Sequence, residues 1–224
     1  MINTIELVKQ RKEEINQYLK LIQDIDSSLI NTQYNSLIVK IMKSNLILML
    51  YNLVEATLQS SFSEIYVKIK EENCKYSVLT DQLRAVWLNQ KVLNCQKELR
   101  NKNIFINIKT IVEHIIFDKS TNFNKSFFNF EGNVDNQVYY ELCKKHGIKF
   151  VGTSHSNDLK YVKDIRNKLA HGDNSFGDCL REKSLNDIKD IKCNVFNYID
   201  NFLDKIRDYY DNKKFIIQKI NPKS

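Results

Sequence analysis

Glycine and proline, the residues that most often end helices and shape turns, are scarce in this chain. Its 224 residues include five glycines and a single proline, Pro222, close to the C-terminus. Because turns between strands depend on these two residues, their scarcity favours long helices. The length suits one domain with a full hydrophobic core. We therefore expect a single all-α helical bundle.

Apolar residues recur at helical spacing along most of the chain. The expected helices cover residues 2–30, 35–70, 81–98, 104–117, 134–145, 156–171 and 185–210. We expect an N-terminal helix in residues 1–31, a core over 35–210, and a basic tail, 211–224, that frays.

Residues 119–133 interrupt the helical pattern and predict a short irregular insertion. This segment places four Phe residues among Asn, Lys and Ser. Aromatic rings among lysines can stack on nucleic-acid bases, or they can pin a loop to the core. The pinned loop is the preferred interpretation.

The last expected helix carries a heptad stripe. Ile188, Val195, Phe202 and Tyr209 recur every seven residues. Such a stripe packs inside a bundle or against a second copy of the chain.

The charge balance favours an anionic partner. Lys and Arg total 34 against 27 acidic residues, a net charge of +7, which suits nucleic acid or an acidic protein. The stretch 84–109 holds six basic residues and one acid. It is either a solvated helix face or an RNA-facing surface. The candidate RNA-binding residues there are Arg84, Lys91, Arg100 and Lys102.

The five cysteines are widely spaced and form no C-x-x-C pair. This pattern indicates neither a disulfide framework nor a zinc site, so we expect no metal and no cofactor. Free thiols fit a reducing cytoplasm, and the N-terminus does not look like a signal peptide. The longest apolar run, Leu46–Tyr51, is too short to span a membrane. We expect a cytoplasmic protein that does not bind a membrane.

One heptapeptide concentrates chemistry: Arg166-Asn167-Lys168-Leu169-Ala170-His171-Gly172. A fixed cation, a carboxamide and an imidazole within six residues can hold a phosphodiester and move protons around it without a metal. The alternative is an ordinary helix end, where Gly takes the left-handed conformation and His interacts with the helix dipole.

Arg166 and His171 lie about 140° apart around a regular helix. One such helix does not aim both side chains at a single phosphate. Either the helix unwinds near His171, or the Arg side chain bends across, or another element completes the site.

The second expected helix carries a polar stripe. Asn45, Asn52 and Gln59 recur every seven residues, and Glu55 lies three beyond Asn52. If the stripe is buried, Glu55 needs a cation, and Arg166 or His171 could supply it. Otherwise the stripe faces water.

The heptapeptide resembles the signature of the HEPN superfamily, an Arg followed by four to six residues and a His. Together with the earlier Asn52-x-x-Glu55, it resembles a HEPN family found in toxin–antitoxin-like or defence neighbourhoods. The resemblance covers residues 36–210. It implies a HEPN-type bundle, a homodimer in which two motif helices share a cleft, and metal-independent RNase activity.

The resemblance also implies residue roles. His171 would act as general base or acid while the ribose 2′-OH attacks the phosphorus, and Arg166 would neutralise charge on the phosphoryl oxygens. Asn167 would orient His171 or bind a phosphate oxygen, with Glu55 and Asn52 supporting the site. Lys168 would contact RNA.

The chain departs from some HEPN toxins at one position. These toxins carry a modifiable Tyr two residues after the His, and this chain has Asp173 there.

Other interpretations of the function stay open. The protein could instead be a non-catalytic HEPN module that binds RNA or nucleotide, a regulatory partner, or a structural helical adaptor. An antitoxin or a defence-system protein is a possible partner.

Overall fold

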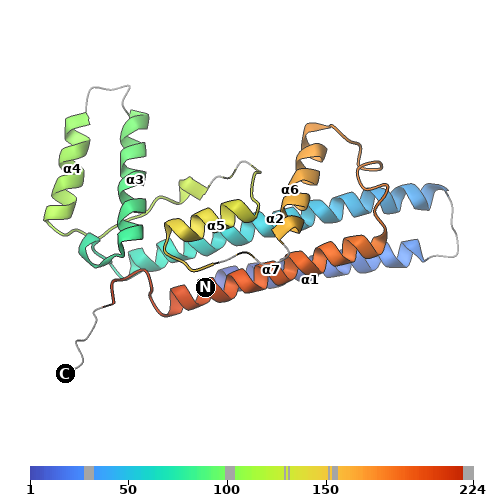
Figure 1. The fold of residues 1–224 in the computed structure, drawn as a ribbon, viewed down its shortest axis with the longest axis horizontal. Coiled ribbons are helices and arrows are strands. Elements are labelled where there is room, and N and C mark those ends of the chain that lie inside the picture. The colour runs from blue at the N-terminus through green and yellow to red at the C-terminus, as the bar shows by residue number, and fades with distance from the viewer. Residues whose placement is uncertain are drawn as a thin grey trace.

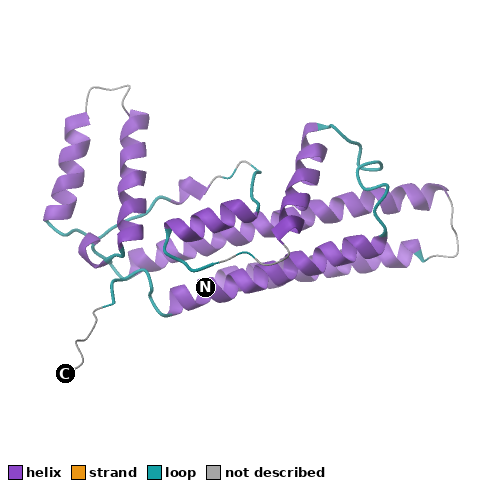
Figure 2. Cartoon of the chain, viewed as in Figure 1, coloured by secondary structure: helices purple, strands orange, loops and turns teal. Residues whose placement is uncertain are grey.

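The computed structural model describes residues 1–27, 33–98, 104–128, 130, 132–150, 152 and 156–218. Its helices are α1 (Ile2–Asp26), α2 (Gln33–Glu71), α3 (Asp81–Glu98), α4 (Ile104–Ile116), α5 (Asn136–Lys145), α6 (Ser156–His171) and α7 (Leu185–Asp211), with 3-10 turns at η1 (Tyr76–Val78) and η2 (Lys125–Phe128). Figure 2 shows helices joined by loops throughout this part of the chain. The all-α bundle predicted from the sequence is confirmed.

The centre of the bundle is α2. Its 39 residues extend over roughly 58 Å at the rise of an α-helix. It packs against α1, α6 and α7, and Figure 1 shows α1 and α7 running beside it while α6 crosses it. Leu46, Leu50, Leu58 and Phe62 of α2 are completely buried, so this helix supplies the core against which the others are placed.

The apolar character of α2 extends well beyond the run Leu46–Tyr51. By length and composition, the stretch Ser36–Glu71 could cross a membrane, and 56% of its most apolar window is buried inside the structure. The run Leu46–Tyr51, on which the sequence prediction was based, therefore underestimates the length of the apolar stretch. The burial is compatible with the core helix of a soluble protein.

The heptad stripe on α7 packs inside the chain. Ile188, Val195, Phe202 and Tyr209 are all buried, and a capping box formed by Ser184 and Asp187 starts the helix. Of the two alternatives, packing within the bundle is what the structure shows. The stripe offers no surface to a second copy.

A hairpin of α3 and α4 stands away from the bundle at one end (Figure 1). Several apolar side chains of α4 are exposed. Phe105, Ile108, Val112 and Ile116 are 87%, 52%, 45% and 70% exposed. α4 therefore presents an apolar surface that the described part of the chain leaves uncovered.

The insertion at residues 119–133 is irregular, as predicted, apart from the turn η2. Its rings face the core: Phe123 stacks on Tyr66 with centroids 4.6 Å apart, and Phe128 lies 5.8 Å from Phe62. The interpretation as a loop pinned by its Phe rings is confirmed for these two residues. The chain returns to α2 just after this segment, where the Val134 N–H donates to the Tyr51 hydroxyl.

The tail packs onto the bundle as far as it is described. Phe215 is fully buried, its carbonyl accepts from the Thr80 N–H at 3.1 Å, and the Ile217 N–H donates to the Val78 carbonyl at 2.9 Å. The expectation of fraying was therefore wrong for residues up to Gln218.

Candidate functional site

The motif lies at the end of α6, which is held firmly from both sides. The apolar stripe of Leu159, Val162, Ile165 and Leu169 is buried. On the polar side, Lys163 forms an ion pair with Asp135, the N-cap of α5. These contacts fix the rotation of α6 about its axis and so decide where the motif side chains point.

α6 stays helical through His171. Gly172 follows with a positive φ of 75°, its N–H donates to Leu169 O at 3.3 Å, and the Asp173 N–H donates to Lys168 O at 2.9 Å. This hydrogen-bond pair is a Schellman motif, which needs a left-handed residue just past the helix. The helix does not unwind before His171, which excludes the first alternative. His171 and Lys168 are exposed.

The Arg166 side chain turns toward α2 instead of along the helix. It is half-buried, its Nη1 donates to Asn167 Oδ1 at 3.0 Å, and its Cζ lies 5.2 Å from the centroid of the Tyr51 ring. Among the contacts of the described residues, none joins Arg166 to His171. Asn167 Oδ1 therefore accepts from Arg166, and among the described residues no hydrogen bond joins Asn167 to His171.

The backbone of Gly132 also lies close to the guanidinium. A Cβ on this glycine would lie 2.1 Å from Arg166 Nη1, far inside van der Waals contact, and its φ is +78°. From the sequence, Gly132 is only a residue near the end of the irregular segment 119–133. A glycine in a glycine-poor chain was the one available signal, and it carried no information about a partner 34 residues away.

Tyr51 was also missed from the sequence, because an aromatic residue inside an apolar helix looks like ordinary core. It is buried, and its hydroxyl accepts from the Val134 N–H at 3.0 Å. Burial raises the pKa of Tyr51; the Val134 N–H lowers it, the Glu55 charge raises it, and the Arg166 charge lowers it. Glu55 and Arg166 thus act on the same hydroxyl.

The polar stripe of α2 mostly faces water. Asn52 and Gln59 are exposed, whereas Asn45 and Glu55 are half-buried. Within the described part of the chain, Glu55 makes no ion pair with Arg166, as the buried-stripe alternative required, nor with His171. Asn52 and Gln59 thus lie on the surface, and Glu55 lies near Tyr51, the residue that Arg166 contacts.

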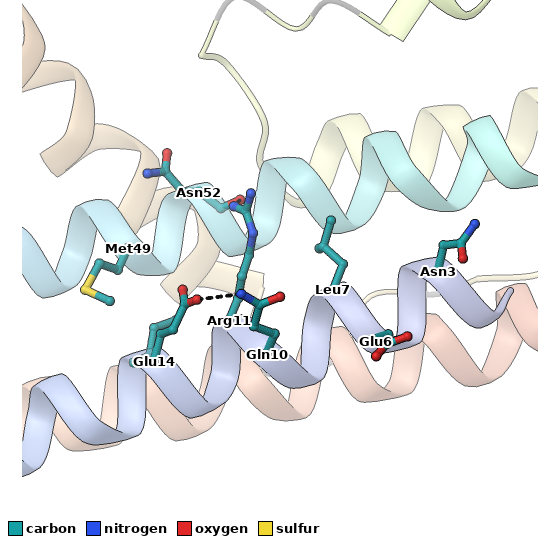
Figure 3. Close-up of a pocket in the computed structure, with 9 residues that line it drawn as sticks. Asn3, Glu6, Leu7, Gln10, Arg11, Glu14, Met49 and Asn52 are labelled. Carbon is teal, nitrogen blue, oxygen red and sulfur yellow. Dashed lines mark hydrogen bonds between the residues drawn. The ribbon is translucent and has the colours of Figure 1, made fainter.

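Asn52 lines a groove between α1 and α2 that lies beside this stripe (Figure 3). Arg11 crosses from α1, and its Nη1 donates to the Asn52 carbonyl at 2.9 Å. Gln10 and Glu14 pair across one turn of α1 at 3.0 Å. The structure therefore associates Asn52 with α1 through its backbone, while its amide remains exposed.

The loop after the motif is tied to α2 as well. Lys43 is buried and donates to the carbonyls of Leu180 and Lys183, and Ser44 Oγ donates to Phe176 O at 2.7 Å. Two neighbouring residues of α2 thus hold the chain that leaves His171.

The basic residues proposed for RNA binding differ in their surroundings. Arg84 Nε donates to Tyr76 O at 3.0 Å and its Nη1 pairs with Asp81 at 3.1 Å, so several of its donors are already used. Lys91 lies over the Trp87 ring, 5.4 Å from the centroid. The other two candidates, Arg100 and Lys102, lie outside the described residues.

Comparison with known proteins identifies the family. The family model of HEPN_MAE_28990-like HEPN domains matches residues 3–215. The chain belongs to the HEPN superfamily. No curated protein and no solved structure matches it. The HEPN match begins in α1 and runs past α7, so it reaches beyond the residues that carried the motif resemblance.

Proposed function

We propose that this HEPN protein is a metal-independent endoribonuclease. The observation that carries the proposal is a guanidinium seated in a fixed position five residues before an exposed imidazole on the same helix. The ribose 2′-OH attacks the adjacent phosphorus, the 5′-oxygen leaves, and the products are a 2′,3′-cyclic phosphate and a 5′-hydroxyl.

Arg166 and His171 divide this work. The described contacts use one of the five N–H groups of Arg166, in its bond to Asn167, so others can neutralise charge gathering on the phosphoryl oxygens. His171, exposed at the helix end, takes the proton of the 2′-OH or protonates the leaving oxygen. Lys168 is exposed beside it and contacts the RNA backbone.

A homodimer is part of the proposal. Arg166 is held over Tyr51 of α2, His171 is the last residue of α6, and among the described residues no hydrogen bond joins the two side chains. Two α6 helices that meet would bring an Arg166 and a His171 from different copies together. The motif resemblance further supports a role as a cytoplasmic toxin or anti-phage effector, controlled by an antitoxin or another defence protein.

The deciding experiment is cleavage of total RNA by purified protein in excess EDTA, with mapping of the 3′ ends. Cyclic phosphate ends from the wild type and none from His171→Ala support the proposal. Lys160→Ala, an exposed position on the same helix, is the control and should cleave like the wild type. Binding of RNA without cleavage would favour the alternative, a non-catalytic HEPN module.

A further inference from the structure

We infer that Tyr51 and Gly132 are positioning residues that hold the Arg166 guanidinium in the orientation needed for cleavage. This inference rests on the proposed ribonuclease function and adds two residues from elements remote in sequence from the motif. Neither residue touches the substrate in this scheme, because both act through Arg166.

The Tyr51 ring is the flat surface on which the guanidinium lies. The separation of 5.2 Å between Cζ and the ring centroid is within the range of a cation–π contact. The ring is fixed in turn, since it is buried and its hydroxyl accepts the Val134 N–H at 3.0 Å. Arg166 therefore meets a surface that cannot rotate away without breaking a buried hydrogen bond.

The guanidinium occupies the space that a side chain on residue 132 would take, and Gly132 leaves that space free. A Cβ there would lie 2.1 Å from Nη1 and 2.4 Å from both Cζ and Nη2 of Arg166. Any other residue must displace the guanidinium from its present position or move the backbone of the segment. Gly132 and Val134 belong to one short segment, so this segment fixes both the ring and the cation.

Gly147 provides a matched control for the backbone cost. Its φ of +73° is within a few degrees of that of Gly132, but the three atoms nearest to a Cβ there would all belong to Gln82, at 3.5 Å or more, an ordinary contact. Gly147→Ala therefore imposes the strain of a left-handed alanine without touching Arg166. A difference between the two alanine variants in the reactivity of Arg166 therefore reflects displacement of the guanidinium and not backbone strain.

The first test needs no RNA. Phenylglyoxal modifies arginine side chains, and peptide mass spectrometry gives the rate at Arg166 relative to the exposed Arg181 and Arg207 of the same molecule. We expect Gly132→Ala to raise the relative rate at Arg166 at least threefold, and Gly147→Ala to leave it unchanged. An unchanged rate in folded Gly132→Ala would overturn the inference.

The second test uses cleavage and covers the case in which Gly132→Ala does not fold. Tyr51→Phe keeps the ring and should retain most of kcat, whereas Tyr51→Leu removes it and should lower kcat at least tenfold with KM nearly unchanged. Equal activity of the Leu and Phe variants would overturn the inference. Wild-type protein that cleaves no RNA would defeat the ribonuclease proposal itself, and the modification rates would still show whether Arg166 is held.

Discussion

The Tyr66 hydroxyl lies 2.9 Å from His146 Nε2 in the closed core of the protein. On the other side of the ring, Nδ1 lies 2.7 Å from the Leu142 carbonyl, so Nδ1–H donates to that carbonyl and Nε2 accepts from Tyr66. Both ring nitrogens are satisfied only while the imidazole is neutral. Burial lowers the pKa of His146 to about 4.

This depressed pKa predicts loss of stability in mild acid. As the pH falls, the unfolded chain binds the proton first, near the ordinary pKa of about 6.5. The stabilisation from His146 is therefore complete above that pH and declines as the pH falls toward 4, with about 2 kcal/mol lost by pH 5. Urea unfolding at pH 7.5 and at pH 5.0 measures the free energy of unfolding at each pH, and the difference gives this loss. His146→Phe should flatten this dependence, and His171→Ala should keep it; identical slopes in all three proteins would contradict the assignment.

Substitution of the motif residues should separate catalysis from folding. His171→Ala removes an exposed side chain and should abolish cleavage without changing the melting temperature. Arg166→Ala should abolish cleavage and also cost about 1 kcal/mol, because it loses its contact with the Tyr51 ring. Cleavage assays and thermal melts on the same samples test both. Wild-type cleavage by either variant would remove that residue from the mechanism.

The composite site predicts a dimer whose copies complement each other. The protein should sediment near twice 26.5 kDa. Arg166→Ala and His171→Ala should each be inactive, yet their mixture should recover part of the activity, because a mixed dimer contains one site with both groups. A monomer that cleaves RNA at wild-type rate, or a mixed dimer without activity, would argue against a shared site.

Glu55→Gln tests whether the carboxylate at the edge of the polar stripe supports the site. Glu55 is half-buried and makes no ion pair with Arg166. Removing its charge should therefore change the free energy of unfolding by less than about 1 kcal/mol. Breaking a buried ion pair would cost roughly 3–5 kcal/mol. We expect reduced cleavage because Glu55 and Arg166 both lie near Tyr51, where the carboxylate attracts the guanidinium toward the ring. Glu71→Gln, an exposed position on the same helix, is the control, and equal rates would place Glu55 outside the site.

The helices and the motif could be predicted from the sequence because their signals are local. α3 begins at Asp81, α6 ends before the left-handed Gly172, and the apolar residues of α6 at helical spacing form its buried face. The seat of Arg166 could not be predicted, since Tyr51 and Gly132 come from elements that meet only in the folded bundle. The polar stripe on α2 was ambiguous for the same reason: periodicity identifies a face but does not say what covers it.

The motif region is attached to α2 at two places, so the spacing of residues along α2 sets the distance between these two attachments. Ser44 holds the loop after His171 and Tyr51 supports Arg166, and these two residues are seven apart on α2. An inserted residue between them would rotate one attachment about 100° away from the other. Homologous chains should therefore tolerate changes of length in the loop at residues 173–183 but keep the Ser44–Tyr51 interval constant.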